Sequence, residues 1–124
     1  MTDHPHGRAL SSREQAVLDK LLSAEFTGAH ELRSQLPEVR ATGNWGEESP
    51  SIDLEASTGT PAAPIKDGVI PSCGTVTDSS GELFGELLVW VSGGRLSALE
   101  FSWYGDTAPT ELPDPEFVTV AVSG

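Results

Sequence analysis

The stretch from residue 86 to residue 106 places the strongest constraint on how this chain can fold. Two apolar runs, residues 87–91 and 96–103, are rich in β-branched and aromatic side chains, and Gly93 and Gly94 lie between them. Two such runs separated by two glycines predict a β-hairpin with a two-residue turn. We expect this hairpin to lie at the centre of a small α+β domain.

A two-residue turn determines which residues of the hairpin face one another. Leu88 would lie opposite Leu99, and Glu86 would not lie opposite Glu100, a like-charge pair that is disfavoured. Both faces of the hairpin would then be largely apolar. One face is predicted to carry Phe84, Leu88, Trp90, Leu99, Phe101 and Trp103, and the other Leu87, Val89, Val91, Leu96 and Ala98, with Glu100. We expect helices to cover one face, and the other face to contact the proline-rich C-terminal segment, the loop around Trp45 or another molecule.

The first third of the chain has the pattern of two short helices. Ser11 and Glu14 have the spacing of a capping box, and an apolar stripe with helical periodicity runs from Val17 to Leu22. A second, shorter helix is predicted over residues 28–36, where Pro37 prevents its continuation. Both stripes are narrow, so we expect these N-terminal helices to pack on the sheet.

The rest of the chain predicts an antiparallel meander of about five strands. Strand patterns cover residues 38–42, 51–56, 69–77 and the two arms of the hairpin, with a tight turn at residues 78–81. Residues 117–122 have β propensity and could add an edge strand. We therefore expect a flexible tail over residues 1–10 and a single α+β domain over residues 11–124.

The charge of the chain is unusual and uneven. Nineteen acidic and seven basic residues give a formal net charge of −12. Residues 38–124 contain fourteen of the acidic residues and only three of the basic ones. This excess disfavours nucleic-acid binding and attracts a basic partner. No apolar segment is long enough to cross a membrane and no leader pattern is present, so we expect a cytoplasmic protein that does not bind membranes.

No familiar catalytic, nucleotide-binding or metal-binding motif occurs in the sequence, and we expect no cofactor. The only cysteine, Cys73, has no histidine near it in sequence, which favours a small buried residue over a nucleophile. His4 and His6 form a pair that could bind a metal weakly, but no third ligand is nearby. Asp53 and Glu55 alternate with apolar residues, as expected for the solvated face of a strand.

The candidate contact residues are aromatic side chains close to carboxylates. Trp45 lies between two glycines in a turn-rich loop, a position that favours a lid over the core and is also compatible with an exposed contact residue. Trp103, Tyr104 and Asp106 end the hairpin. Two further acidic residues, Glu111 and Asp114, follow. Such a combination can hold a cationic ligand or a partner rich in arginine and lysine, although a strand end followed by a solvated segment would give the same pattern.

The segments 94–100, 103–106 and 112–115 (GRLSALE, WYGD and LPDP) resemble a family of small uncharacterised proteins of high-GC Gram-positive bacteria. The resemblance covers residues 11–116 and implies one compact domain. It carries no activity. Members often have cysteines where this chain has residues 43–47 (GNWGE), so the resemblance implies no metal or redox role for that loop here.

Together these patterns favour a non-catalytic acidic interaction module that binds a basic protein, such as an inhibitor or immunity-like protein. Self-association through the hairpin face is another way to cover that surface. The alternative is a small-ligand-binding domain or minor enzyme with a pocket between the helices and the sheet, near Trp45, Tyr104 and Asp106. A structural accessory domain without a ligand is also compatible with the sequence.

Overall fold

The structure, a computed structural model, describes residues 7–123 and has an α+β fold. Two helices and an antiparallel sheet confirm the predicted fold class, but the sheet has eight strands rather than about five. The helical elements are α1 (Ser12–Leu22), α2 (Ala29–Gln35), η1 (Leu36–Glu38) and η2 (Pro115–Phe117). The strands are β1 (Arg8–Ala9), β2 (Arg40–Asn44), β3 (Ile52–Glu55), β4 (Gly68–Val69), β5 (Ser72–Thr77), β6 (Leu83–Ser92), β7 (Arg95–Trp103) and β8 (Val118–Val122).

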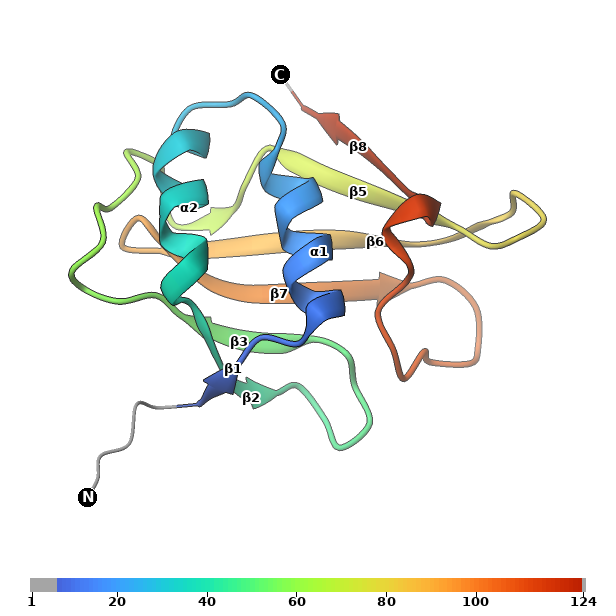
Figure 1. Cartoon of the computed structure of the whole chain (residues 1–124). Helices are drawn as coiled ribbons and strands as arrows, with labels where there is room; N and C mark the ends of the chain where they lie inside the picture. Colours follow the sequence, from blue (N-terminus) through green and yellow to red (C-terminus); the bar gives the residue numbers. More distant parts are fainter. Residues whose placement is uncertain (1–6, 124) are drawn as a thin grey trace.

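The strands follow the order β1-β2-β3-β7-β6-β5-β8 across the sheet, and β4 pairs with β6 beyond the end of β5. All pairings are antiparallel. The predicted hairpin, β6 and β7, lies in the middle (Figure 1). The predicted strand at the C-terminal end is confirmed as β8, which lies at one edge of the sheet.

Two additional strands account for part of the difference from the predicted count. The segment predicted as one strand over residues 69–77 is divided into β4 and β5, because Pro71 lacks the N–H group that a continuous ladder needs. Arg8 and Ala9 form β1 beside β2, so the chain is paired where the prediction placed a flexible tail. The helices consequently follow a strand. Residues 1–6, with His4 and His6, lie outside the described residues.

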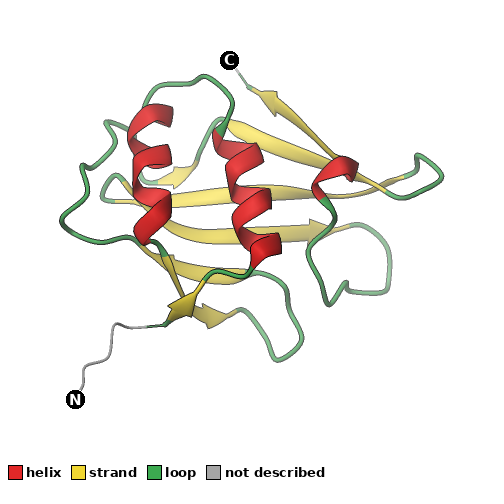
Figure 2. Ribbon diagram, viewed as in Figure 1, coloured by secondary structure: helices red, strands yellow, loops and turns green. Residues whose placement is uncertain are grey.

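Both helices lie on the same face of the sheet, in front of it in Figures 1 and 2. The predicted capping box begins α1, because the Ser11 hydroxyl accepts a hydrogen bond from the Glu14 N–H at 3.1 Å and the Glu14 carboxylate accepts one from the Ser11 N–H at 2.8 Å. The apolar stripe of α1 is completely buried against the sheet. It consists of Val17, Leu18, Leu21 and Leu22.

The hairpin has the predicted two-residue turn. Gly93 and Gly94 have φ angles of +61° and +77°, a left-handed conformation that glycine adopts without strain. The predicted pairing holds only for the first two residue pairs after the turn. Ser97 is then an additional residue in β7, a β-bulge, and from Ala98 onwards every partner is displaced by one position.

The bulge makes the predicted assignment of the hairpin faces wrong. Leu99 lies opposite Val89, and Phe101 lies opposite Leu87, so these four apolar side chains face the helices. These residues are at most 2% exposed and form the centre of the core. Burial of each such side chain contributes about 1.5–3 kcal/mol to folding. The sheet therefore has one apolar face, against the helices, instead of two.

The opposite face, here called the open face, has no helix over it (Figure 2). On β6 and β7 it carries mixed side chains, most of them half-buried: Glu86, Leu88, Trp90, Ala98, Glu100 and Ser102. The predicted uncovered surface thus exists, but it is acidic and aromatic rather than apolar.

Candidate functional site

Carboxylates on the open face fix two of the three tryptophans. Asp53 lies beside Ala98 of β7, and Ala98 lies beside Trp90 of β6. The indole N–H of Trp45 donates to Asp53 Oδ1 at 3.1 Å, and that of Trp90 donates to Glu100 Oε1 at 3.0 Å. Among the described residues, the second oxygen of each carboxylate accepts no hydrogen bond. Each indole ring therefore has a defined position, and each carboxylate can still bind an external donor.

A cleft of about 370 Å³ lies where β3 begins, beside the part of β7 that extends past its pairing with β3. Trp45 and Trp103 both line it and are 47% and 42% exposed. Its other lining residues are Ser49, Ser51, Glu100, Phe101 and Ser102. A tryptophan face next to a carboxylate attracts a cation through the ring quadrupole and the negative charge together.

The start of β3 holds one side of this cleft in place. The Ser51 hydroxyl accepts a hydrogen bond from the Phe101 N–H at 2.9 Å, and the Ser49 hydroxyl accepts one from the Ser51 N–H at 3.1 Å. Trp45 also donates its backbone N–H to the Ser51 carbonyl at 3.0 Å. Ser51 therefore connects the loop that carries Trp45 to β7, the strand that carries Glu100.

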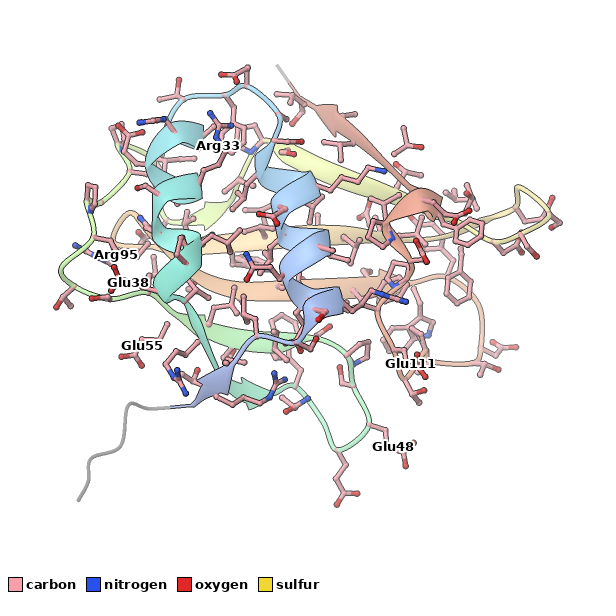
Figure 3. The ribbon with its side chains drawn as sticks, in the orientation of Figure 1. Arg33, Glu38, Glu48, Glu55, Arg95 and Glu111 are labelled. Atoms are coloured by element: carbon pink, nitrogen blue, oxygen red, sulfur yellow. The ribbon has the colours of Figure 1, made fainter. Side chains whose placement is uncertain are left out.

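A second cleft of about 250 Å³ shares Ser49 and Trp103 with the first. Its wall includes Glu47 and Glu48 of the β2–β3 loop, and Thr110 of the segment after β7. In Figure 3, Glu48 lies on the β2–β3 loop and Glu111 on the neighbouring segment, at the same end of the sheet. Trp103 thus stands between two depressions that carboxylates border.

Most basic side chains bind acceptors within the protein. Arg8 forms an ion pair with Glu14, and six of the seven bases donate at least one hydrogen bond. Arg95, for example, donates to the Thr60 carbonyl at 2.7 Å and lies against the β3–β4 loop (Figure 3). Within residues 7–123, by contrast, only three carboxylates form ion pairs: Glu14, Glu25 and Asp114. The acidic surface is therefore largely unneutralised.

The structure brings only some of the predicted contact residues together. Trp45 and Trp103 share the first cleft, whereas Glu111 lines an adjacent cavity of about 330 Å³ with Ser11 and Arg13, which shares only Ser49 with the first cleft. Asp114 has a structural role, because its carboxylate caps η2 and lies 4.0 Å from Arg13. The remaining two, Tyr104 and Asp106, lie in the exposed segment after β7.

Sequence reasoning missed Glu100, Ser51 and Ser102 as cleft residues. The assumed regular ladder placed Glu100 on the same face as Leu87 and Val89, which are core residues. A polar serine inside the apolar run, Ser97, was the only available signal of the bulge that reverses this assignment.

Cys73 is not activated as a nucleophile. Partial burial raises the pKa of its thiol, and the nearby Glu86 carboxylate, 3.8 Å from Cys73 Sγ, raises it further. Both effects disfavour the reactive thiolate. In the described part of the chain, no three histidine, cysteine or acidic side chains lie close enough together to hold a metal ion.

The space between the helices and the sheet is filled by the core, and Trp45 binds Asp53 on the opposite side. Within residues 7–123 there is no helix with the length and apolar character needed to cross a membrane. A comparison with known protein families, curated proteins and solved structures finds no match for this chain. The family resemblance seen in the sequence therefore stays a prediction.

Proposed function

We propose that this protein is a non-catalytic interaction module that binds a basic protein partner at the end of the sheet where β3 begins, beside the open face. The partner would place an arginine or lysine side chain in the cleft between Trp45 and Trp103, beside Glu100. The single observation that carries this proposal is the shared cleft, which combines two exposed tryptophans with a carboxylate. Such a role fits an inhibitor or immunity-like protein that masks a basic surface.

The distribution of charge supports the same conclusion. The basic side chains are largely occupied by internal acceptors, so few of them can neutralise the acidic surface. A basic partner would be attracted over a distance of about one Debye length, roughly 8–10 Å at physiological salt. Long-range attraction increases the association rate, and the cleft then provides the specific contact.

The contribution of the cleft can be separated from that of net charge with two matched variants. Glu100→Gln and Glu38→Gln each remove one negative charge. Glu100 lies in the cleft, whereas Glu38 is exposed beside the helices on the other face (Figure 3). Trp45→Ala removes one aromatic wall and leaves the net charge unchanged.

Binding of a deca-arginine peptide, followed by tryptophan fluorescence at low and high salt, tests the proposal. We expect Trp45→Ala and Glu100→Gln each to weaken binding by about 5- to 30-fold, as expected for a lost cation–π or charged contact. Glu38→Gln should change affinity by less than about twofold. Equal effects of the two glutamate variants would show that net charge alone attracts the peptide. That result would refute the proposal that the cleft is the binding site. Binding that does not weaken with salt would refute the electrostatic model.

A further inference from the structure

The free edge of β8 is the least protected part of the sheet. No strand among the described residues pairs with its outer side, and Figure 1 shows nothing beyond it. The strand has the sequence VTVAV and contains no charged side chain. The opposite edge, β1, is only two residues long and carries Arg8. A charged or very short edge resists pairing with another chain, and β8 has neither property.

The hydrogen bonds to β5 show which backbone groups of β8 point outward. Ser123 donates its N–H to the Pro71 carbonyl at 3.0 Å, in the same register that pairs Ala121 with Cys73 and Thr119 with Thr75. In an antiparallel ladder, alternate residues direct both their N–H and C=O groups to the same neighbour. The backbone groups of Val120 and Val122 therefore point away from β5.

Val118 points its carbonyl outward as well, but its N–H is already bonded to the Pro115 carbonyl at the end of η2. The exposed edge thus offers two donors and three acceptors within five residues. Buried backbone groups need partners, and edge groups of this kind are satisfied either by water or by another strand.

We infer that β8 pairs antiparallel with β8 of a second copy of this chain, about a twofold axis through Val120. In that register Val120 faces its own counterpart, and Val118 faces Val122 in both directions. The strand VTVAV is nearly symmetric in sequence. In this register each valine on the side of the helices therefore lies opposite a valine of the other copy. In the single copy Val120 is partly buried and Val122 is exposed, and this pairing would cover both.

Charge also favours the antiparallel arrangement. Glu116 is exposed and lies two residues before the strand. A parallel pair would bring the two copies of Glu116 side by side, whereas the antiparallel pair places them at opposite ends. In a chain with a net charge of −12, an uncharged strand is where two copies can meet with least repulsion. Because only five residues a side take part, the dimer should be weak, with a dissociation constant of roughly tens to hundreds of micromolar.

Thr119 and Ala121 allow the register to be tested without disturbing the core. Both are exposed on the open side of the sheet, and the proposed pairing places Thr119 opposite Ala121 of the other copy. The double variant Thr119→Lys with Ala121→Glu would put opposite charges across the interface twice and leave the net charge unchanged. The variant Thr119→Glu with Ala121→Glu would put like charges there.

Sedimentation equilibrium between about 10 µM and 1 mM measures the result, with circular dichroism as a check that each variant folds. We expect the parent to form a dimer at the upper concentrations, and the lysine–glutamate variant to associate about 2- to 30-fold more tightly. The double-glutamate variant should be monomeric. A control with the same added charge on the β3–β4 loop, Thr58→Glu with Ala62→Glu, should still dimerise.

Three outcomes would overturn the inference. The first is a parent that stays monomeric at 1 mM. The second is a double-glutamate variant that associates as strongly as the control. The third is assembly beyond a dimer, because a twofold pairing of one edge closes at two copies. The inference does not depend on the proposed binding of a basic partner, because the tryptophan cleft lies on other strands.

Discussion

Gln35 connects three parts of the fold, and its removal gives the sharpest test of the structure. Its side chain is completely buried, an unusual environment for a glutamine. The amide nitrogen donates to the Pro61 and Gly94 carbonyls, both at 2.9 Å, and the amide oxygen accepts from the Leu96 N–H at 3.0 Å. β3 pairs with β7 only at Ala98 and Leu99, so Gln35 supplies the acceptor that no strand provides to Leu96.

The perturbation is Gln35→Met, which keeps the length of the side chain and leaves little cavity. The buried Leu96 N–H would lose its acceptor, at a cost of about 1–3 kcal/mol. The Gly94 carbonyl keeps a hydrogen bond from Ala63 at 2.8 Å, and Pro61 is exposed and can bind water, so these two add only about 1 kcal/mol. We expect a total loss of about 2–4 kcal/mol in the free energy of unfolding.

Urea unfolding followed by circular dichroism measures this loss, and the slope of the transition should not change. The matched control is Gln15→Met on α1, where the glutamine is partly exposed and makes no side-chain hydrogen bond within residues 7–123. This control should lie within about 0.5 kcal/mol of the parent. Hydrogen exchange gives a local readout, because the Leu96 amide should exchange faster in Gln35→Met. Equal stabilities of the two variants would refute the reasoning.

Two further predictions concern local interactions. Arg8 lowers the pKa of Glu14 through a bidentate hydrogen bond, so the stabilisation is present at neutral pH and is lost as the pH falls through the lowered pKa. Glu14→Gln should destabilise the protein by about 0.5–1 kcal/mol at pH 7, since Arg8 is half exposed, and a difference that persists in acid would contradict this origin. In the hairpin turn, Gly94→Ala should be much more destabilising in thermal unfolding than Gly93→Ala. Both glycines have positive φ, but only at Gly94 would a β-carbon lie 2.6 Å from the Ala63 carbonyl oxygen. Similar melting temperatures of the two variants would contradict this steric explanation.

Local patterns were sufficient to predict the helices, the turn and most strands. α1 combines a capping box with an apolar stripe, and Gly93-Gly94 matches the conformation that a two-residue hairpin turn needs. β1 was missed because two residues carry no periodicity, and Arg8 and Ala9 become a strand only because β2 lies beside them.

The candidate site was predicted less completely, because it depends on contacts between distant segments. Trp45 and Trp103 were each identified as candidate contact residues, but their common cleft arises from the pairing of β3 with β7. Asp114 and Glu111 were grouped with them by proximity in sequence. In the fold Asp114 caps η2. The local sequence Asp-Pro-Glu is sufficient to explain this structural role.

The β-bulge at Ser97 explains why one small error in the predicted register changes the expected function. Shifting a strand by one residue moves every subsequent side chain to the other face. A regular ladder would place Leu99 and Phe101 with Trp90, and Glu100 in the core, so the uncovered face would be apolar and suited to self-association. The bulge instead buries Leu99 and Phe101 and turns Glu100 outward, where it binds the indole of Trp90 and lines the cleft of Trp45. The acidic character of the open face, and with it the preference for a cationic partner, therefore depends on a single additional residue in β7.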